Sequence, residues 1–338
     1  MMRLPWFDYR APDSIEEAAK ILAWEGAGAM LVAGGTDLLP NMKRRHQMPA
    51  TLVSLRKIEA LKRVANGNGL RLGAALTLTE LLAVRGLRDR YRGLAQAAGQ
   101  VATPQLRNMG TLGGNLCLDT RCTYYNQNYE WRKAIDFCMK KDGEVCWVAT
   151  ASKRCLAVSS TDTAPALIAL GARVRLVSAA GEREVALGDL YNNDGIEYLT
   201  RKPDEILTDV LLPKADGWKS SYWKLRRRGA FDFPLLGVAA AAKLAADGTV
   251  EAARLVLGAV SSHPLVIKSD ALIGKKLGDD AIAAIGEAAE SRAKPMDNTD
   301  MDLRWRKHVV ADFVGYALRE LRGDDMGATR LRTARQMV

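Results

Sequence analysis

Several features that would assign a protein class are missing from this chain of 338 residues. No apolar run reaches the roughly 18 residues that a membrane-spanning helix needs. The first residues lack the apolar core of a secretory signal, so we expect a cytoplasmic protein without membrane attachment. Aromatic residues make up only 6%, and the three histidines, His46, His263 and His308, lie in no HExxH pattern. We therefore assign these histidines structural roles.

Motifs for acid–base or nucleophilic catalysis are also missing. The sequence contains no GxSxG, no P-loop and no GxGxxG, and no pair of carboxylates stands out. We therefore predict no catalytic residue in this chain. The composition is 48% hydrophobic and 26% charged, which is ordinary for a globular protein. The chain is long enough for two domains.

The net charge is +10, which raises the question of nucleic-acid binding. Basic residues cluster at Lys43-Arg44-Arg45 and Arg226-Arg227-Arg228, but no aromatic residues are interleaved with them regularly. Helix-turn-helix and zinc-finger patterns are absent as well. We predict no nucleic-acid partner, and a basic surface that solvates the protein or docks another protein.

All five cysteines lie between residues 117 and 155. Such clustering does not suit a disulfide framework, and the absence of a CxxC pair argues against a zinc ribbon. Separated thiolates suit an iron–sulfur cluster at least as well, so the spacing leaves zinc, iron–sulfur and no metal as open alternatives. Cys117 stands between Leu116 and Leu118, and we expect it to be buried and unligated. The remaining four are the candidate ligands: Cys122, Cys138, Cys146 and Cys155.

Hydrophobic periodicity predicts a β–helix–β order in the first half of the chain and an antiparallel sheet later. We expect helices over residues 14–24, from 77, over 90–101 and over 164–170. Strands are expected over residues 29–33, 52–54, 70–73, 173–177, 182–187 and 206–212. A polar stretch near 213–219 predicts a domain boundary. Beyond it we expect three strands, 221–228, 238–244 and 253–260, and helices over 279–293 and 302–322.

Two glycine-rich stretches follow or flank these elements. Glycines remove Cβ atoms, so consecutive amide groups approach an anion closely. Two such turns would hold two parts of one long phosphorylated ligand, with backbone donors meeting the phosphates. The stretches are Leu31-Val32-Ala33-Gly34-Gly35-Thr36-Asp37-Leu38 and Thr111-Leu112-Gly113-Gly114-Asn115.

Taken together, these stretches resemble the paired FAD motifs of the flavoprotein subunits of molybdenum hydroxylases, the family of xanthine and carbon monoxide dehydrogenases. The resemblance covers nearly the whole chain. It implies an α+β fold, with an FAD-binding fold of two α/β subdomains over residues 1–215 and a subdomain boundary near 55. A C-terminal antiparallel three-stranded sheet with helices would fill 216–338. The implied FAD contacts are both glycine stretches together with Val101, Asp162, Leu207 and Lys224. The family has a threonine where this chain has Leu118.

One departure from the family pattern points to a particular branch of the family. In most relatives the Gly-Gly-Asn turn and the Asp-x-x-Pro motif are only a few residues apart, whereas here residues 116–161 intervene. The insertion is similar to one in a reductase branch of the family, the 4-hydroxybenzoyl-CoA reductases, where it binds a [4Fe–4S] cluster. The resemblance thus implies an iron–sulfur loop over 117–158.

The same resemblance implies a function in electron transfer. Electrons from reduced ferredoxin would pass through the [4Fe–4S] cluster and FAD to a small two-[2Fe–2S] subunit and a large molybdopterin subunit, in a dimer of heterotrimers. The alternative is a flavin subunit that passes electrons outward to NAD or oxygen and has a structural, zinc-filled cysteine loop.

Overall fold

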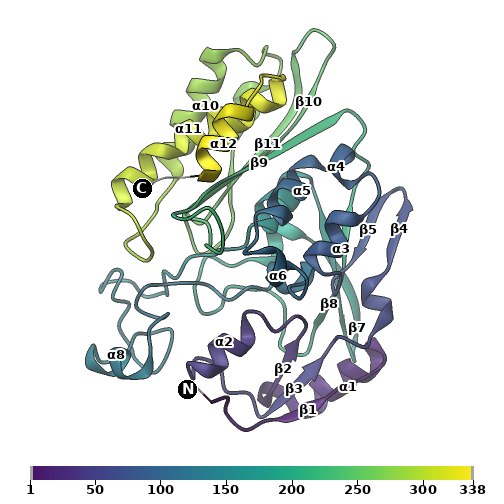
Figure 1. Ribbon diagram of the computed structural model, residues 1–338, viewed down its shortest axis with the longest axis vertical. Coiled ribbons are helices and arrows are strands. Elements are labelled where there is room, and N and C mark those ends of the chain that lie inside the picture. Colours follow the sequence, from purple (N-terminus) through teal and green to yellow (C-terminus); the bar gives the residue numbers. More distant parts are fainter. Residues whose placement is uncertain (1–2, 336–338) are drawn as a thin grey trace.

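The computed structural model describes residues 3–335 of the chain (Figure 1). Its strands form three sheets with the orders β1-β3-β2, β4-β5-β8-β6-β7 and β12-β11-β10-β9. Residues 1, 2 and 336–338 of the expected domain ranges lie outside the described residues. The strands are β1 Asp8–Arg10, β2 Ala29–Val32, β3 Thr51–Ser54, β4 Val64–Gly67, β5 Gly69–Gly73, β6 Arg173–Ser178, β7 Gly181–Ala186, β8 Ile206–Leu212, β9 Trp218–Leu225, β10 Leu236–Leu244, β11 Val250–Gly258 and β12 Leu265–Ile267.

The helices cover one or both faces of these sheets. They are α1 Ile15–Glu25, α2 Leu38–Lys43, α3 Leu78–Ala83, α4 Leu87–Arg90, α5 Arg92–Gly99, α6 Pro104–Arg107, α7 Leu112–Leu116, α8 Tyr129–Ala134, α9 Thr163–Ala169, α10 Asp279–Arg292, α11 Leu303–Arg322 and α12 Gly327–Arg335. Among residues 3–335, no helix is both long and apolar enough to cross a membrane.

The first sheet is small and parallel, with β3 between β1 and β2. Helix α1 begins at the cap residue Ser14, whose hydroxyl accepts a hydrogen bond from the Glu17 amide at 3.1 Å. Its buried residues Ala18 and Leu22 pack against Val53 of β3. Strand β2 ends at the first glycine stretch, so this sheet positions one side of the site.

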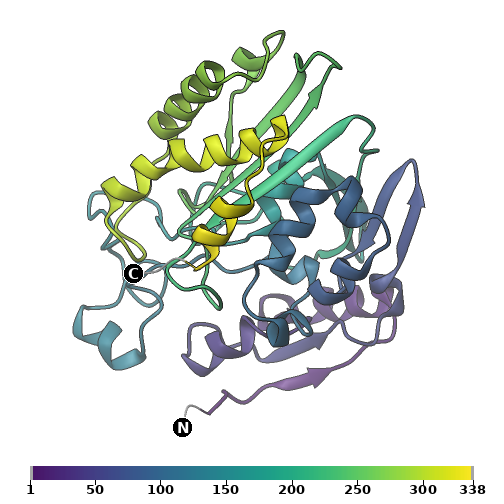
Figure 2. The ribbon, with the colours of Figure 1, turned by 45° about the horizontal axis from the view of Figure 1, so that its top comes forward.

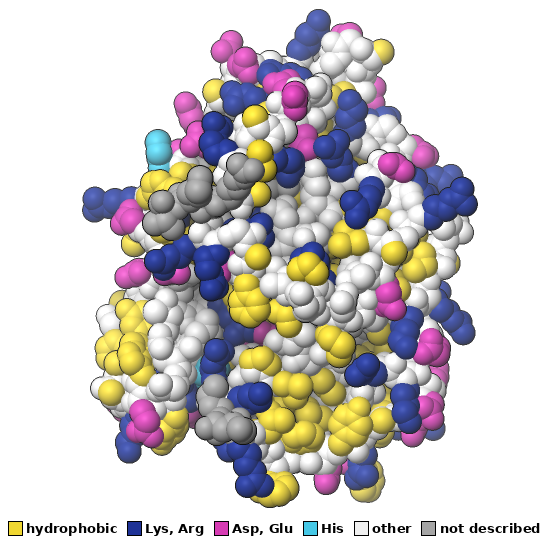
Figure 3. Space-filling view, in the orientation of Figure 1, with side chains coloured by type: hydrophobic (Ala, Val, Ile, Leu, Met, Phe, Trp, Pro, Cys, Tyr) yellow, Lys and Arg dark blue, Asp and Glu magenta, His cyan; other side chains and the backbone are white. Residues whose placement is uncertain are grey.

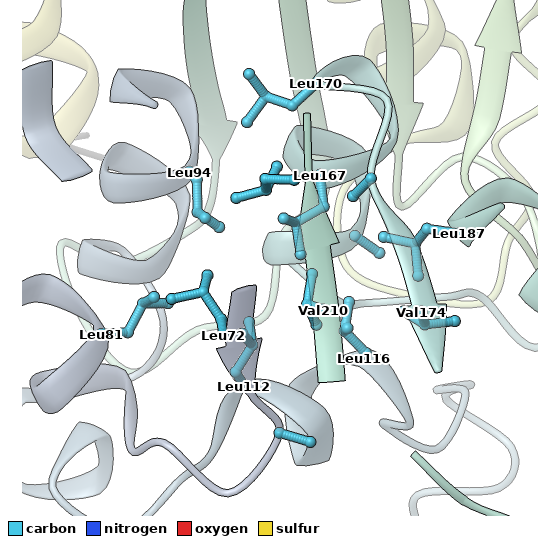
Figure 4. Packing of buried hydrophobic residues seen from close by; sticks show 14 of the residues in the cluster. Leu72, Leu81, Leu94, Leu112, Leu116, Leu167, Leu170, Val174, Leu187 and Val210 are labelled. Carbon is cyan, nitrogen blue, oxygen red and sulfur yellow. The ribbon is translucent and has the colours of Figure 1, made fainter. Parts of the chain in front are cut away.

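The second sheet is antiparallel throughout, and its core lies on one face. Leu72, Val210 and Val174 stand in register on β5, β8 and β6 and point to the same side. Leu112 of α7 and Leu167 of α9 cover them (Figure 4). Burying each of these side chains contributes roughly 1.5–3 kcal/mol of transfer free energy. The second glycine stretch is therefore fixed to this core by its own leucines.

The third sheet is apolar on both faces, because neighbouring side chains alternate between two cores. Trp223, Val238 and Leu257 face α10 and α11. Tyr222 and Ala239 face α5 and α9 of the preceding part. Figure 2 shows β9–β11 between the two helix pairs. The C-terminal part is thus built onto the rest of the chain through a shared core.

The α+β fold class expected from the sequence is confirmed, with differences in detail. The C-terminal sheet has four strands instead of three, because β12 pairs with the edge of β11. The helix expected over 90–101 is broken at Tyr91, which is buried and donates a hydrogen bond to Pro213 O at 2.8 Å. The short strands β1 and β4 and the C-terminal helix α12 carry too little periodicity to be recognised in the sequence.

Candidate functional site

A cavity of about 870 Å³ opens between the first two sheets, and the loop between β9 and β10 reaches its edge. Both glycine stretches line it, together with residues 196–199 and the aromatic side chains Phe231 and Phe233. Both phenylalanines are more than 40% exposed, so they stand at its mouth. A volume of this size lies within the range of cofactor and drug-sized ligand sites.

The first glycine stretch joins the end of β2 to the start of α2. Among the described residues, the backbone N–H groups of Gly34, Gly35, Thr36 and Asp37 find no hydrogen-bond acceptor. Gly35 has φ +70°, a conformation that favours glycine. Four open amides at a helix start form a site for a phosphate oxygen or another anion.

The two glycine stretches meet at Gly34. A Cβ atom on this residue would overlap the carbonyl oxygen of Met109, which lies two residues before the second stretch. Only glycine therefore allows the backbones to approach so closely. This contact joins the first sheet to the second at the floor of the cavity.

The second glycine stretch is the beginning of helix α7 instead of an open turn. Thr111 caps it, accepting a hydrogen bond from the Gly114 amide at 3.1 Å. The Leu112 and Gly113 amides donate to Leu76 O and Ala74 O at 2.9 and 2.8 Å. The expectation that both stretches offer free amides to a phosphate is therefore wrong for Leu112–Asn115 of the second stretch, whose amides already donate within the protein. Its role is to shape the wall.

Asn115 ties α7 to α9 across the insertion. Its Oδ1 accepts hydrogen bonds from Thr161 Oγ1 at 2.9 Å and from the amide and hydroxyl of Thr163 at 3.2 and 2.6 Å. Arg121 and Val158 then pair their backbones at 2.8 and 2.7 Å. The two ends of the insertion therefore lie side by side, and helices α7 and α9 remain in contact in the cavity wall.

Asp162 follows this contact and is buried at the cavity. Lys224 Nζ of β9 donates to its carboxylate at 2.9 Å, and the hydroxyl of Tyr222 donates to it at 2.8 Å. Burial raises the pKa of the Asp162 carboxyl and lowers the pKa of the Lys224 ammonium, while the charge of each partner opposes the shift of the other. The pair links the third sheet to the cavity wall.

The structure brings most of the sequence-predicted flavin residues together. Leu112 is the first exception, because its side chain is fully buried in the second core. Lys224 is the second, because it lies behind Asp162 and does not line the cavity. The residues that do line it are Leu31, Val32, Ala33, Gly34, Gly35, Thr36, Asp37, Leu38, Val101, Thr111, Gly113, Gly114, Asn115, Asp162 and Leu207.

Several lining residues were not found from the sequence. Phe231 and Phe233 form an aromatic pair beside an arginine run, and Phe231 has φ 71°. Arg121 forms an ion pair with Asp37 and donates to Asn41 Oδ1 at 3.1 Å. Burial lowers the pKa of Arg121 to about 10. The aromatic pair at a turn was the available signal; nothing in the sequence indicated Arg121.

The insertion forms a lobe around α8 beside α2 (Figure 1). Residues from before and after the insertion hold it in place. His46 Nε2 donates to Gln127 O at 3.2 Å, Gly195 N to Cys155 O at 2.9 Å, and Asn298 Nδ2 to Leu156 O at 2.6 Å. Protein contacts thus hold this loop in place.

Aromatic side chains of the lobe divide into two groups. Tyr125 is buried and stacks on His46, with ring centroids 4.2 Å apart. Tyr129, Trp131 and Trp147 are each more than a third exposed. Figure 3 shows hydrophobic side chains gathered over this lobe, whereas Lys and Arg are spread over the face with Asp and Glu among them. Tyr129 packs on Phe137 and Trp131 on Tyr124, with ring centroids 5.7 and 6.3 Å apart, so packing inside the loop accounts for Tyr125 fully and for these two side chains in part.

Cys122, Cys138, Cys146 and Cys155 line one small void of about 10 Å³. All are free and buried, and burial raises the pKa of Cys122 to about 12 and that of Cys155 to about 11. Among residues 3–335, no three His, Cys, Asp or Glu side chains are arranged to hold a metal ion. Cys117 instead lines the large cavity, where burial raises the pKa of its thiol.

The large cavity, with open amides on one side and an aromatic mouth on the other, is that of a protein that binds a long phosphorylated cofactor. Two family models match the chain: the FAD binding domain in molybdopterin dehydrogenase over residues 5–215, and the CO dehydrogenase flavoprotein C-terminal domain over residues 220–321. This chain belongs to the family of FAD-binding medium subunits of molybdenum hydroxylases.

Individual relatives agree with this assignment. The aldehyde oxidoreductase FAD-binding subunit PaoB of Escherichia coli is 34% identical over 78% of this chain and 84% of its own length. The carbon monoxide dehydrogenase medium chain of Hydrogenophaga pseudoflava is 26% identical over 93% of this chain and 96% of its own. A carbon monoxide dehydrogenase structure from the same organism matches with a TM-score of 0.75, covering 95% of this chain and 99% of that chain.

The residues present fit FAD, and the chain is an FAD-binding oxidoreductase subunit. The four open amides of residues 34–37 suit the diphosphate, and the cavity volume suits a dinucleotide. These relatives are named as the FAD-binding subunit or the medium chain of their enzymes.

Proposed function

We propose that this chain is the flavin and [4Fe–4S] subunit of a ferredoxin-dependent 4-hydroxybenzoyl-CoA reductase. Its partners would be a large molybdopterin subunit and a small two-[2Fe–2S] subunit, in a dimer of heterotrimers. FAD exchanges electrons singly or in pairs when bound, and a [4Fe–4S] cluster exchanges them one at a time. The chain itself would bind both groups, orient them and exclude water.

The convergence of four cysteines beside the FAD cavity supports the proposal most directly. These thiols come from positions spread over the insertion, and four of the five cysteines line the same void. Four thiolates are the ligand set of such a cluster. Cys117, which was expected to be unligated, lines the other cavity. We therefore propose that four cysteines together bind the cluster: Cys122, Cys138, Cys146 and Cys155.

The geometry sets a condition on cluster binding. A void of about 10 Å³ barely accommodates one water molecule, so it must widen before a four-iron cluster enters. Four thiolates that bind four different irons stand further apart than four that share one ion. The raised thiol pKa values also mean that binding must release protons.

The flavin half of the proposal assigns roles to the chain's residues. The amides of residues 34–37 would bind the diphosphate, and the wall from Thr111 to Asn115 would support the ribityl chain. The Asp162–Lys224 pair would hold a hydrogen-bonding group at the cavity without an unpaired charge. Phe231 and Phe233 would shield the mouth from water.

Metal and flavin analysis tests this function. The complete complex should be purified anaerobically and its iron, sulfide, zinc and FAD measured per chain. We expect about eight irons and one FAD per heterotrimer, because the two [2Fe–2S] clusters of the small subunit contribute about four of the irons. Cys138→Ser should lose about four irons and keep FAD, whereas Cys117→Ser, the matched control, should keep all eight and FAD. Zinc in place of iron, or unchanged iron in Cys138→Ser, would contradict the proposed cluster.

The direction of electron flow needs a separate measurement. Reduced ferredoxin should reduce the complex faster than NADH, and 4-hydroxybenzoyl-CoA should reoxidise it. Equal rates with NADH would support the alternative, an FAD subunit that passes electrons outward and has a structural cysteine loop. The small void and the relatives named as dehydrogenases are the observations that favour this alternative.

A further inference from the structure

A buried ammonium, that of Lys140, stands between the FAD cavity and the cysteine void. Lys140 lines the void, and only 7% of its side chain is exposed. Its Nζ donates to Asp119 Oδ1 at 2.8 Å, to Thr120 Oγ1 at 2.5 Å and to Gly195 O at 2.6 Å. Three acceptors use all three donors of an ammonium group, so its position is fixed.

The partners of Lys140 belong to both sites. Asp119 and Tyr198 line the FAD cavity, whereas Tyr125 lines the cysteine void. The ammonium lies 4.7 Å from the ring centroid of Tyr125 and 5.4 Å from that of Tyr198. The hydroxyl of Tyr125 donates to Asp119 Oδ2 at 2.9 Å. One hydrogen-bonded group of side chains therefore forms the wall that the two sites share.

The backbone completes this wall at Gly195. Its carbonyl accepts from Lys140, and its amide donates to Cys155 O at 2.9 Å. A Cβ on Gly195 would lie 2.6 Å from Cys155 Sγ. The following residues, Ile196–Leu199, line the FAD cavity. The segment 195–199 therefore contacts both sites.

A buried ammonium is costly unless negative charge compensates it. Asp119 neutralises Lys140 as the protein stands, so the wall carries no net charge. Binding of a cluster by four thiolates adds net negative charge on one side, and a reduced flavin adds electron density on the other. The cation of Lys140 lies where it stabilises the negative charge of both groups, because Coulomb interactions are strong in a buried, weakly polarisable region.

We propose that Lys140 is a positioning residue shared by both redox sites: held by Asp119 and Gly195, its charge raises the reduction potentials of the flavin and of the metal centre together. The metal half of this inference rests on the proposed [4Fe–4S] function; the flavin half rests on the FAD cavity alone. A positive charge favours the reduced, more negative form of each centre.

Lys140→Met in the complete complex tests this role, because methionine keeps the length and removes the charge. Lys141→Met is the matched control: Lys141 is the next residue, pairs with Asp142 and lines neither site. We expect both midpoint potentials to move to more negative values in Lys140→Met and to stay unchanged in Lys141→Met, as measured by redox titration of the visible and EPR spectra. Equal flavin potentials in the two variants would overturn the inference.

A second variant covers the case in which Lys140→Met fails to fold. Asp119→Asn keeps an oxygen for Lys140 and removes the carboxylate, so the flavin potential should become more positive. No shift in this variant would contradict the role of the wall. If the wild-type complex contains only the iron of the small subunit's clusters, the proposed reductase function fails, but the flavin potentials of the same variants still decide whether Lys140 acts on FAD.

Discussion

Asn115 and Thr163 stand 48 residues apart in the chain and are joined by a hydrogen bond of 2.6 Å between the Thr163 hydroxyl and Asn115 Oδ1. The same oxygen accepts two further hydrogen bonds, from Thr161 Oγ1 and from the Thr163 amide. The FAD cavity wall is therefore continuous in space although the cysteine loop interrupts it in sequence.

Asn115→Ala should destabilise the protein, because it leaves two buried hydroxyls and one amide without their acceptor. We expect the free energy of unfolding to fall by about 2 kcal/mol, measured by urea unfolding, and FAD to dissociate more readily. Asn66→Ala is the control, since Asn66 accepts a hydrogen bond only at the exposed Arg90. A variant as stable as the control would show that this contact does not hold the wall.

Gly34→Ala should separate the two glycine stretches. The new methyl group would overlap Met109 O, so the first stretch must move away from the second. We expect FAD affinity to fall at least about tenfold, which corresponds to roughly 1.4 kcal/mol. Gly28→Ala is the control, because its Cβ would only touch Ala50 Cβ at 3.8 Å. Equal FAD dissociation constants in the two variants would contradict the close approach.

Gly195→Ala should damage the cysteine site and spare the FAD cavity. The added Cβ would press on Cys155 Sγ at 2.6 Å and on Ala157 N at 2.9 Å. We expect bound metal per chain to fall and FAD per chain to stay constant. Gly188→Ala, whose Cβ meets nothing closer than Ile168 at 4.0 Å, should change neither. Loss of FAD from Gly195→Ala with metal retained would argue against this arrangement.

His46 should make the protein less stable in mild acid. Burial lowers its pKa from 6.5 to about 4, so the unfolded chain binds a proton between these values and the folded chain does not. Stability is full above pH 6.5 and falls as the pH drops toward 4, by up to about 3 kcal/mol for this group. Urea unfolding of His46→Phe should show a smaller loss over this range. His308→Gln, at an exposed site, should behave like the wild type.

Two of the cysteines should be unreactive in metal-free protein. Because burial raises the pKa of Cys122 to about 12 and of Cys155 to about 11, almost none of either thiol is ionised at pH 8. In iron-free protein we expect iodoacetamide to modify them at least about 100-fold more slowly than in urea. Peptide mass spectrometry measures both rates. Equal rates in the folded and unfolded protein would show that the void opens freely.

The sequence was most informative where a residue type is required by local geometry. Gly34 and Gly35 were assigned to the site because glycines let consecutive amides approach an anion and because their stretch resembles an FAD motif of the family, and both line the cavity. Thr77 and Glu80 predicted a helix start and do form a capping box. Such signals depend on residues that are close in the chain, so sequence reasoning reaches them.

The direction of side chains and the pairing of residues far apart in the chain were harder to predict from the sequence. Leu112 was assigned to the cofactor with its neighbours, but the helical start of α7 turns its side chain into the second core. Arg121 reaches Asp37 across a gap in sequence that no local pattern reports. The three residues of β12 form a strand only because β11 offers an edge. Each depends on a partner placed by the rest of the fold.

The third sheet also constrains the order in which the protein matures. Its alanine-rich inner face packs on α5 and α9, and Lys224 on β9 neutralises Asp162 at the FAD cavity. A ribosome must therefore release β9–β11 before the cavity acquires its final wall and charge. An isolated fragment of residues 3–215 would keep an uncovered apolar face, so cofactor insertion is expected to follow synthesis of the whole chain.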